Sequence, residues 1–174
     1  MGLALRAADW TVAGYDPCRS TVTSALARGA IDRAAESPVE AAHGCGIVVL
    51  ASPLSTMPAL IDALKADPDG PIAVTDVGSA KRNVVARGEA AFGGKFVGGH
   101  PMAGSVRGGI AAASTILFRG VPWIVTKTAR SEPEACRAVK QLVKDCGALP
   151  ILCTPEEHDR WIARVSHLPH AVAY

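Results

Sequence analysis

Short apolar runs that alternate with helical patterns constrain the fold of this 174-residue chain more than any other feature of its sequence. The run at residues 46–51 (Gly-Ile-Val-Val-Leu-Ala) is apolar at every position, as expected for a central strand with both faces covered. Further strands are expected at residues 10–15, 72–75, 95–97, 123–126 and 149–152, and helices at residues 20–28, 56–65, 81–90, 134–145 and 155–173. This alternation predicts an α/β fold built on a doubly wound, mostly parallel sheet.

Capping boxes mark the starts of two expected helices. In such a box a Ser or Thr cap is followed three residues later by Glu, and the two residues satisfy backbone donors at the helix N-terminus. The segments Ser131–Glu134 and Thr154–Glu157 have this pattern, so both helices are expected to begin there.

Charge, cysteine content and hydropathy exclude several classes of partner. The formal net charge is +2, aromatic residues make up 5% of the chain and no basic run exceeds Lys81-Arg82, so no nucleic-acid partner is expected. The 5 cysteines form no C-x-x-C pair, which is typical of a reducing compartment. No apolar run reaches the length of a membrane span and no signal peptide is present, so we expect a cytoplasmic protein without a membrane partner.

Small or polar residues follow successive predicted strands. Ligands of doubly wound sheets bind outside the carboxyl ends of the strands, so these residues are expected to share one site. The residues are Asp16, Ser52, Pro53, Asp76, Gly78, Ser79, Gly99 and His100.

His100 is the most distinctive of them, because it stands between a glycine pair and Pro101. Glycine lets the backbone approach a ligand closely, and proline stiffens the turn. An imidazole held there is well placed to move a proton near pH 7. A solvated histidine in an ordinary loop is the alternative.

Asp16 and Ser79 each allow two interpretations. A carboxylate after the second strand of a dinucleotide fold accepts hydrogen bonds from the adenine ribose and repels a 2′-phosphate, which predicts NAD in preference to NADP. Taken alone, Asp16 before Pro17 is more typical of a turn, and the nearby Arg19 could accommodate a phosphate. Ser79 precedes the expected helix at 81–90, where its hydroxyl caps the helix or contacts the substrate or nicotinamide.

The last expected helix has a polar face and an apolar stripe by helical spacing. The polar face holds Asp159, Ala163, Ser166 and His170, with His167 beside it. The apolar stripe holds Trp161, Ile162, Val165 and Leu168. A solvated surface and a zinc site from Cys153, His167 and His170 are alternatives for the polar side, but that spacing matches no standard zinc pattern, so no metal site is predicted.

Segments 74–81 (VTDVGSAK), 99–105 (GHPMAGS), 158–159 (HD) and 166–170 (SHLPH) together resemble prephenate dehydrogenases, a family that includes arogenate and cyclohexadienyl dehydrogenases. The resemblance covers nearly the whole chain, in order and with compatible spacing. It implies a Rossmann-type domain that binds NAD. It also implies oxidative decarboxylation of prephenate to 4-hydroxyphenylpyruvate in tyrosine biosynthesis, with hydride passing to NAD.

The resemblance also implies roles for individual residues. His100 matches the catalytic histidine that takes the proton of the ring C4 hydroxyl, and Ser79 matches a serine that orients this hydroxyl and the histidine. His170 matches a histidine on the substrate side of the pocket, supported by His167. Substrate contacts are further expected from Gly104 and Ser105, and cofactor contacts from Asp16, Ser52, Pro53, Asp76 and Gly78.

The chain departs from the family pattern at both ends and at Val106, where the family commonly has Glu. The family opens with a strand and a glycine-rich turn, whereas residues 1–6 resemble the helix that follows this turn. Residues 1–154 are therefore expected to form an incomplete dinucleotide-binding domain. Residues 155–174 are expected to begin a truncated helical domain that makes a homodimer in the full-length family.

Other functions remain open from the sequence alone. One alternative is arogenate dehydrogenase, and another is a reductase of imino or β-hydroxy acids on the same cofactor fold, which would have no catalytic need for His100. A third is a non-catalytic remnant or fragment that acts through interactions.

Overall fold

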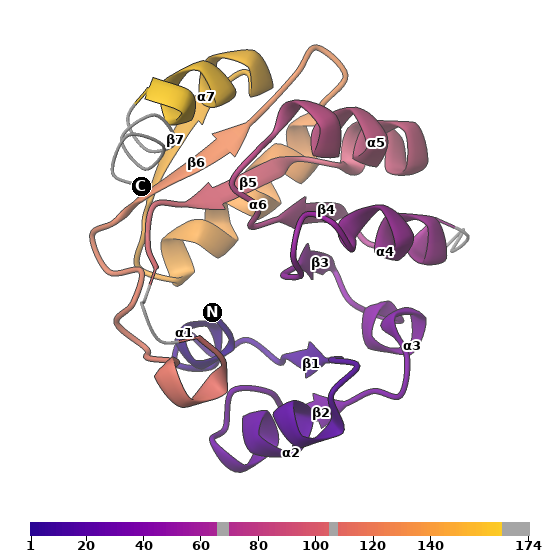
Figure 1. Cartoon of the computed structure of the whole chain (residues 1–174), viewed down its shortest axis with the longest axis vertical. Coiled ribbons are helices and arrows are strands. Elements are labelled where there is room, and N and C mark those ends of the chain that lie inside the picture. The colour runs from indigo at the N-terminus through magenta and orange to yellow at the C-terminus, as the bar shows by residue number, and fades with distance from the viewer. Residues whose placement is uncertain (66–69, 105–107, 165–174) are drawn as a thin grey trace, which may run out of the picture.

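The computed structural model describes residues 1–65, 70–104 and 108–164 (Figure 1). The strands are β1 (Ala13–Gly14), β2 (Arg33–Ala34), β3 (Ile47–Leu50), β4 (Ala73–Asp76), β5 (Gly98–Pro101), β6 (Pro122–Thr126) and β7 (Leu149–Cys153). The helices are α1 (Gly2–Arg6), α2 (Arg19–Ala27), α3 (Pro38–Ala42), α4 (Met57–Leu64), α5 (Arg82–Phe92), α6 (Pro133–Asp145) and α7 (Pro155–Ile162), with short 3-10 turns η1 (Gly93–Lys95) and η2 (Ile110–Ala112).

Most strand pairs are parallel, as the sequence predicts. β1 pairs with β2, β3 with β4 and β6 with β7 in parallel, and only the β5–β6 ladder is antiparallel among the described strands. A parallel bridge from Val74 to Phe96 joins the β3–β4 pair to the segment that leads into β5. Among the described strand pairs, none links β1 to β3, and β1 and β2 lie together in the lower part of Figure 1.

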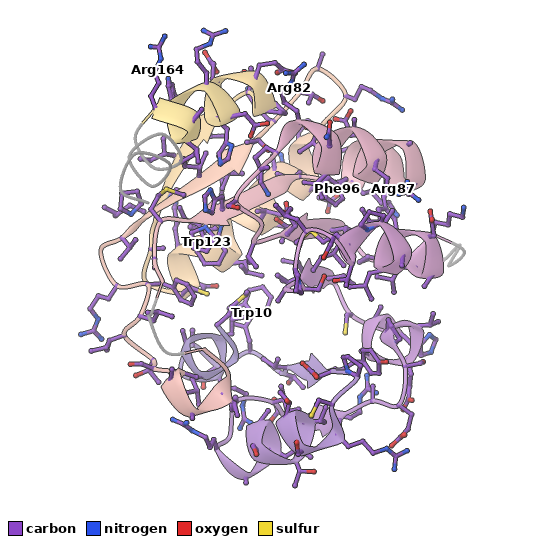
Figure 2. The ribbon with its side chains drawn as sticks, viewed as in Figure 1. Trp10, Arg82, Arg87, Phe96, Trp123 and Arg164 are labelled. Carbon is purple, nitrogen blue, oxygen red and sulfur yellow. The ribbon has the colours of Figure 1, made fainter. Side chains whose placement is uncertain are left out.

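Successive residues of β4 pack on opposite faces of the sheet. Ala73 belongs to a core that includes Trp123 and the buried residues of α6, whereas Val74 belongs to a second core with Phe96 and residues of α4 and α5. Side chains alternate between faces along a strand, so a strand covered by helices on both sides is apolar throughout. Figure 2 shows Trp123 and Phe96 inside the molecule and Arg82, Arg87 and Arg164 at its surface. The Rossmann-type, doubly wound α/β fold is therefore confirmed.

Helix α5 lies close against the sheet because it carries Gly88. A Cβ atom at this position would come within 2.3 Å of the Phe96 ring, so any larger residue would push the helix outward. This close approach sets the position of the N-terminal end of α5, where the candidate site begins.

Several local predictions differ from the structure. The strand expected at residues 95–97 is displaced, since β5 covers Gly98–Pro101 and therefore includes His100. Apolar residues mark burial, while the ladder with β6 needs only backbone groups, which Gly98 and Gly99 supply. The capping box at Thr154 is confirmed, but the one at Ser131 is wrong: Glu132 is the N-cap of α6, and the Ser131 hydroxyl accepts from the Thr128 N–H.

Candidate active site

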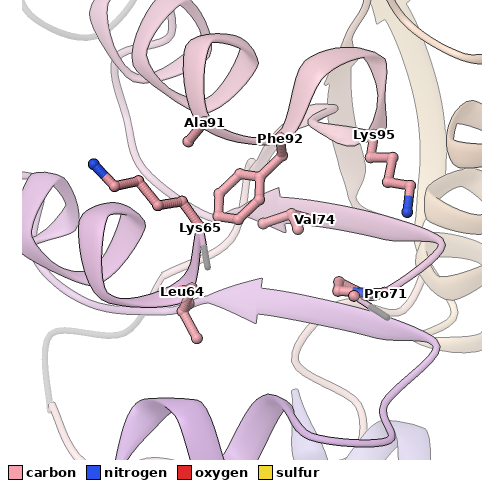
Figure 3. A pocket seen from close by; sticks show the side chains of 8 residues that line it. Leu64, Lys65, Pro71, Val74, Ala91, Phe92 and Lys95 are labelled. Carbon is pink, nitrogen blue, oxygen red and sulfur yellow. The ribbon is translucent and has the colours of Figure 1, made fainter. Parts of the chain in front are cut away.

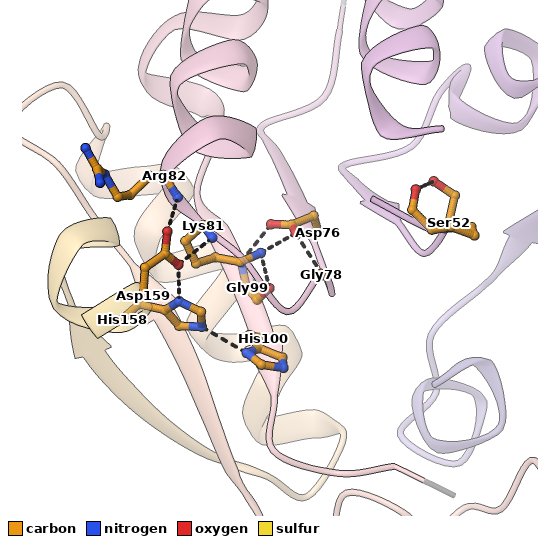
Figure 4. Close-up of polar contacts among 10 residues, drawn as sticks. Ser52, Asp76, Gly78, Lys81, Arg82, Gly99, His100, His158 and Asp159 are labelled. Carbon is orange, nitrogen blue, oxygen red and sulfur yellow. Dashed lines mark hydrogen bonds and ion pairs between the residues drawn. The ribbon is translucent and has the colours of Figure 1, made fainter. Parts of the chain in front are cut away.

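Several of the predicted site residues lie where β3 and β4 end and β5 runs past them (Figure 4). Leu50 and Asp76 are paired at the ends of the parallel strands β3 and β4, so the segments that follow them emerge at the same edge. The turn at Gly78 lies against the segment after β3, since a Cβ there would be 2.5 Å from Leu54 Cδ2. This edge is the position expected for a ligand site in a doubly wound sheet.

A buried ion pair between Asp76 and Lys81 forms the floor of this edge. Both side chains are 0% exposed, and Lys81 Nζ donates to Asp76 Oδ2 and to the carbonyl oxygen of Gly99 at 2.8 Å. The Asp76 carboxylate also accepts from the backbone N–H of Gly78 at 2.8 Å and from that of Gly99 at 3.1 Å. Burial lowers the pKa of Lys81, and the neighbouring Asp76 carboxylate opposes this shift. A buried carboxylate with this many donors fixes the backbone on both sides of it.

His100 is connected through a second histidine to a carboxylate on α7. Its Nδ1 lies 2.9 Å from Nε2 of His158, and the two ring centroids are 5.1 Å apart. Nδ1 of His158 lies 2.7 Å from Asp159 Oδ1. His100 is half-buried on β5, whereas His158 is 0% exposed. The result is a line of three polar groups, in which the buried His158 links the partly exposed Asp159 to the half-buried His100.

Asp159 also caps α5 from another element. Its Oδ1 accepts from the backbone N–H of Lys81 at 2.7 Å, and its Oδ2 accepts from that of Arg82 at 3.0 Å. Partial burial disfavours the charge, but donors from Arg82, His158 and Lys81 hold the pKa of Asp159 below its ordinary value. A carboxylate at a helix N-terminus is also stabilised by the helix dipole. Helix α5 and helix α7 are thereby joined at the site.

Burial lowers the pKa of the His158 imidazole from its ordinary value of 6.5. The hydrogen bond to Asp159 works in the opposite direction, and the nearby Lys81 charge works with burial. A histidine in this setting is neutral at pH 7.

Comparison with known proteins assigns the chain to a family. The family model described as "Prephenate dehydrogenase, nucleotide-binding domain" matches residues 1–152. The chain belongs to this family. It is 34% identical over 165 residues to the prephenate dehydrogenase of Bacillus subtilis (strain 168), a match that covers 93% of this chain and 44% of the relative.

Solved structures of a prephenate dehydrogenase and an arogenate dehydrogenase agree with this fold. The Aquifex aeolicus enzyme in complex with hydroxyphenyl propionate and NAD+ superposes with a TM-score of 0.90 at 32% identity, over 99% of this chain and 61% of that one. The Synechocystis arogenate dehydrogenase structure gives a TM-score of 0.88 at 30% identity, over 97% of this chain and 60% of that one. The chain therefore spans 44–61% of the length of these relatives.

The structure brings some of the family residues together and leaves others apart. His100, Asp76 and Gly78 meet at the ligand edge, and Ser52 lies across from them at the end of β3 (Figure 4). Ser79 is exposed and makes no cap hydrogen bond to α5, because Asp159 takes that place.

Other predicted residues lie farther out or beyond the description. Pro53 and Gly104 are exposed. Ser105, His167 and His170 lie outside the described residues, so their predicted substrate contacts stay predictions. The cofactor contact predicted for Asp76 also stays a prediction.

The Asp16 end of the site is open to water. Asp16 is half-buried, and its Oδ1 accepts from the backbone N–H of Cys18 at 2.8 Å, which is the turn interaction that the sequence offered as an alternative. Arg19 pairs with Glu36 at 2.8 Å, with 89% and 78% of the two side chains exposed. Hydrogen bonds from Ser20 and Thr21 lower the pKa of the exposed Cys18 thiol to about 7.

Sequence reasoning missed the partners of His100. The sequence assigns His158 to a motif but gives it no role, and the predicted apolar stripe of the last helix includes Trp161, which is 43% exposed. The buried residues of α7 are Pro155, His158 and Ile162. Their helical spacing is the signal that would have found His158 as an inward-facing polar group.

A hollow elsewhere on the surface has a different character. It lies at the start of β4 and is lined by Leu64, Lys65, Gly70, Pro71, Val74, Ala91, Phe92 and Lys95 (Figure 3). None of the predicted site residues lines it. In the described part of the chain, no group of three or more His, Cys, Asp or Glu residues is arranged to hold a metal ion, and no helix is long and apolar enough to cross a membrane.

Proposed function

We propose that the protein carrying this chain oxidatively decarboxylates prephenate to 4-hydroxyphenylpyruvate and transfers hydride to NAD. The observation that carries the proposal is His100 at the ligand edge, supported from behind by His158. Membership in the prephenate dehydrogenase family supports it, as does the complex of the Aquifex relative with hydroxyphenyl propionate and NAD+.

His100 would act as the base of this reaction. As hydride leaves C4 of the substrate ring, a carbonyl forms there and the hydroxyl proton must be accepted. A neutral imidazole at the strand is suited to accept it. The carbon–carboxylate bond then breaks, CO₂ leaves, and its electron pair makes the ring aromatic. The C4 oxygen takes back a proton and becomes the hydroxyl of 4-hydroxyphenylpyruvate.

The residues at the sheet edge fit part of a dinucleotide. When bound, NAD supplies the carbon atom that accepts the hydride. Asp16 would accept hydrogen bonds from the adenosine ribose, and Ser52, Pro53 and Gly78 would border the nicotinamide end. The turn at this edge requires glycine at residue 78, because a Cβ there would lie 2.5 Å from Leu54 Cδ2. We propose that a glycine-rich turn before residue 1 holds the pyrophosphate.

The substrate contacts are proposed for Ser79, Gly104, Ser105, His167 and His170. Ser79 would orient the C4 hydroxyl toward His100, and the histidines would face the rest of the ring. Arogenate is the second candidate substrate, because the Synechocystis relative is an arogenate dehydrogenase at 30% identity.

The proposal extends to domain organisation and partners. Residues 1–154 would bind NAD, and residues 155–174 would begin a helical domain that forms a homodimer. All cysteines are free in the structure, which supports a reducing, cytoplasmic location.

The test uses an extended protein, in which this chain is joined to a glycine-rich strand and turn before residue 1 and to a helical domain after residue 174. The extended protein is incubated with NAD and prephenate, and NADH, CO₂ and 4-hydroxyphenylpyruvate are measured. Equal amounts of all three products are expected. Turnover of arogenate alone would move the assignment to the second candidate, and turnover of neither would reject both.

A further inference from the structure

Both ring nitrogens of His158 have a partner at hydrogen-bond distance, Asp159 Oδ1 on one side and His100 Nδ1 on the other (Figure 4). We propose that His158 and Asp159 are positioning residues that hold His100 in the tautomer protonated at Nδ1. Nε2 of His100 then carries the lone pair and is the atom that accepts the substrate proton. That this proton comes from the substrate depends on the proposed function. The tautomer of His100 does not, because it is a property of the protein without ligand.

The direction of the hydrogen bonds starts at Asp159. An ionised carboxylate only accepts hydrogen bonds. Its two oxygens accept from the backbone N–H groups of Lys81 and Arg82, at 2.7 and 3.0 Å, which anchors the carboxylate at the start of α5. Since Asp159 Oδ1 is an acceptor, Nδ1 of His158 must be the donor across their 2.7 Å contact.

The second step depends on the charge of His158. The groups that face it are Asp159 on the same helix, Lys81 before α5, Asp76 on β4, His100 on β5 and Cys153 on β7. Burial lowers the pKa of His158 and keeps its imidazole neutral. A neutral imidazole with its proton on Nδ1 has a lone pair on Nε2. Nδ1 of His100 must therefore donate to it.

The opposite charge state would reverse the arrangement. A protonated His158 would present an N–H from Nε2, and Nδ1 of His100 would then accept it. His100 would carry its proton on Nε2, where it cannot act as a base. The neutrality of His158 thus decides which nitrogen of His100 is available for proton transfer.

The tautomers are measured by long-range ¹H–¹⁵N correlation spectra of the extended protein without substrate at pH 7.5. His100 and His158 are expected to be protonated at Nδ1 and unprotonated at Nε2, with signals assigned by single His→Gln variants. His43 is the matched control, because it is exposed on the surface after α3. A spectrum in which His100 carries its proton on Nε2 overturns the inference, whatever the enzyme activity.

Variants of His158 provide the second measurement. His158→Phe removes the acceptor, so we expect a shift of His100 toward the Nε2–H tautomer. We also expect a roughly 10- to 100-fold lower kcat with little change in KM, the usual effect of losing a supporting partner. His158→Gln keeps an acceptor oxygen and should recover most of kcat. A His158→Phe protein that folds, keeps the Nδ1–H tautomer and keeps kcat contradicts the inference, and if this variant does not fold, the spectrum of the parent decides.

The outcomes separate this inference from the proposed function. If His100 has the Nδ1–H tautomer but the extended protein turns over neither prephenate nor arogenate, the proposed function fails and the tautomer assignment stands. If turnover is normal and His100 has the Nε2–H tautomer, the proposed function stands and the inference fails.

Discussion

The two ends of the candidate site differ in how their side chains are held. At the His100 end, Asp76, Lys81 and His158 are 0% exposed. Asp76 and Lys81 bind each other and the backbone, and His158 binds His100 and Asp159. At the Asp16 end, the described hydrogen bond is to a backbone N–H in an exposed turn. Buried side chains hold the His100 end, whereas the Asp16 end is exposed to water.

This difference predicts that the enclosed end governs turnover and that the open end governs cofactor choice. Charges and dipoles fixed in a water-poor environment act strongly on a reacting group and need no reorganisation during the reaction. Exposed charges such as Arg19 and Glu36 are screened by water and salt, so they adjust affinity by small amounts. We therefore expect changes at the enclosed end to alter turnover or stability and changes at the open end to alter cofactor choice.

The largest expected effect is on turnover at the enclosed end. In the extended protein, His100→Asn should lower kcat roughly 10²- to 10⁴-fold, the usual contribution of a positioned base. Substrate KM should change much less, and His43→Asn should leave kcat unchanged. Steady-state kinetics with prephenate measure this, and a kcat within a few-fold of the parent would show that His100 is not the base.

The next effect is on stability. Lys81→Met leaves the buried Asp76 carboxylate without its cation, so the free energy of unfolding should fall by about 3–5 kcal/mol in urea titrations. Arg87→Met breaks the exposed pair with Asp62 and should cost less than about 1 kcal/mol. The double variant Asp76→Asn/Lys81→Met should recover part of the loss. Equal costs at the buried and exposed pairs would show that burial does not distinguish the two ion pairs.

The pH dependence of the free energy of unfolding should also show the effect of burying His158 at the enclosed end. The unfolded chain binds a proton at His158 near pH 6.5, whereas the folded chain binds it only at lower pH, because burial lowers the pKa. Stability contributed by neutral His158 is therefore present above pH 6.5 and lost as the pH falls below it, by up to about 1.4 kcal/mol per pH unit. Urea titrations between pH 7.5 and 5.5 should show a steeper loss in the parent than in His158→Gln. Parallel curves would mean that His158 titrates alike in both states.

The smallest expected effect is at the open end. The parent should prefer NAD to NADP, and Asp16→Ser should narrow the difference while its hydroxyl still accepts from Cys18. Repulsion between two charges about 4 Å apart in water is worth roughly 1 kcal/mol, which corresponds to about a five-fold change. Kinetics with both cofactors measure it, with Glu134→Gln as the control for loss of an exposed carboxylate. A parent that uses NADP better would show that Arg19 governs the choice.

Much of the fold could be predicted from local signals. The apolar run at residues 46–51 contains β3, and the Thr154–Glu157 capping box starts α7 as expected. The strand β2 was missed because Arg33–Ala34 is too short to show a pattern. The Ser131 box is wrong because the Ser131 hydroxyl accepts from the Thr128 backbone N–H, a contact that only the turn geometry reveals.

The candidate site was predictable where one segment carries the signal. His100 stands out through its glycine and proline neighbours, and the structure places it at the ligand edge. The hydrogen bonds that hold it come from residues 58 and 78 positions away from their partners, His158 to His100 and Asp159 to Lys81. Periodicity assigns such residues to a face of their own helix but does not indicate which strand that face meets.

His100 occupies a ladder position opposite Ile124 in the β5–β6 pair, so sheet hydrogen bonds hold its backbone. Over evolutionary time, loops accept insertions and substitutions far more readily than paired strands do. Lineages that inherit this scaffold can therefore exchange surface segments while the ring that we propose as the proton acceptor stays in place. Such an arrangement permits specificity to diverge around one conserved reaction.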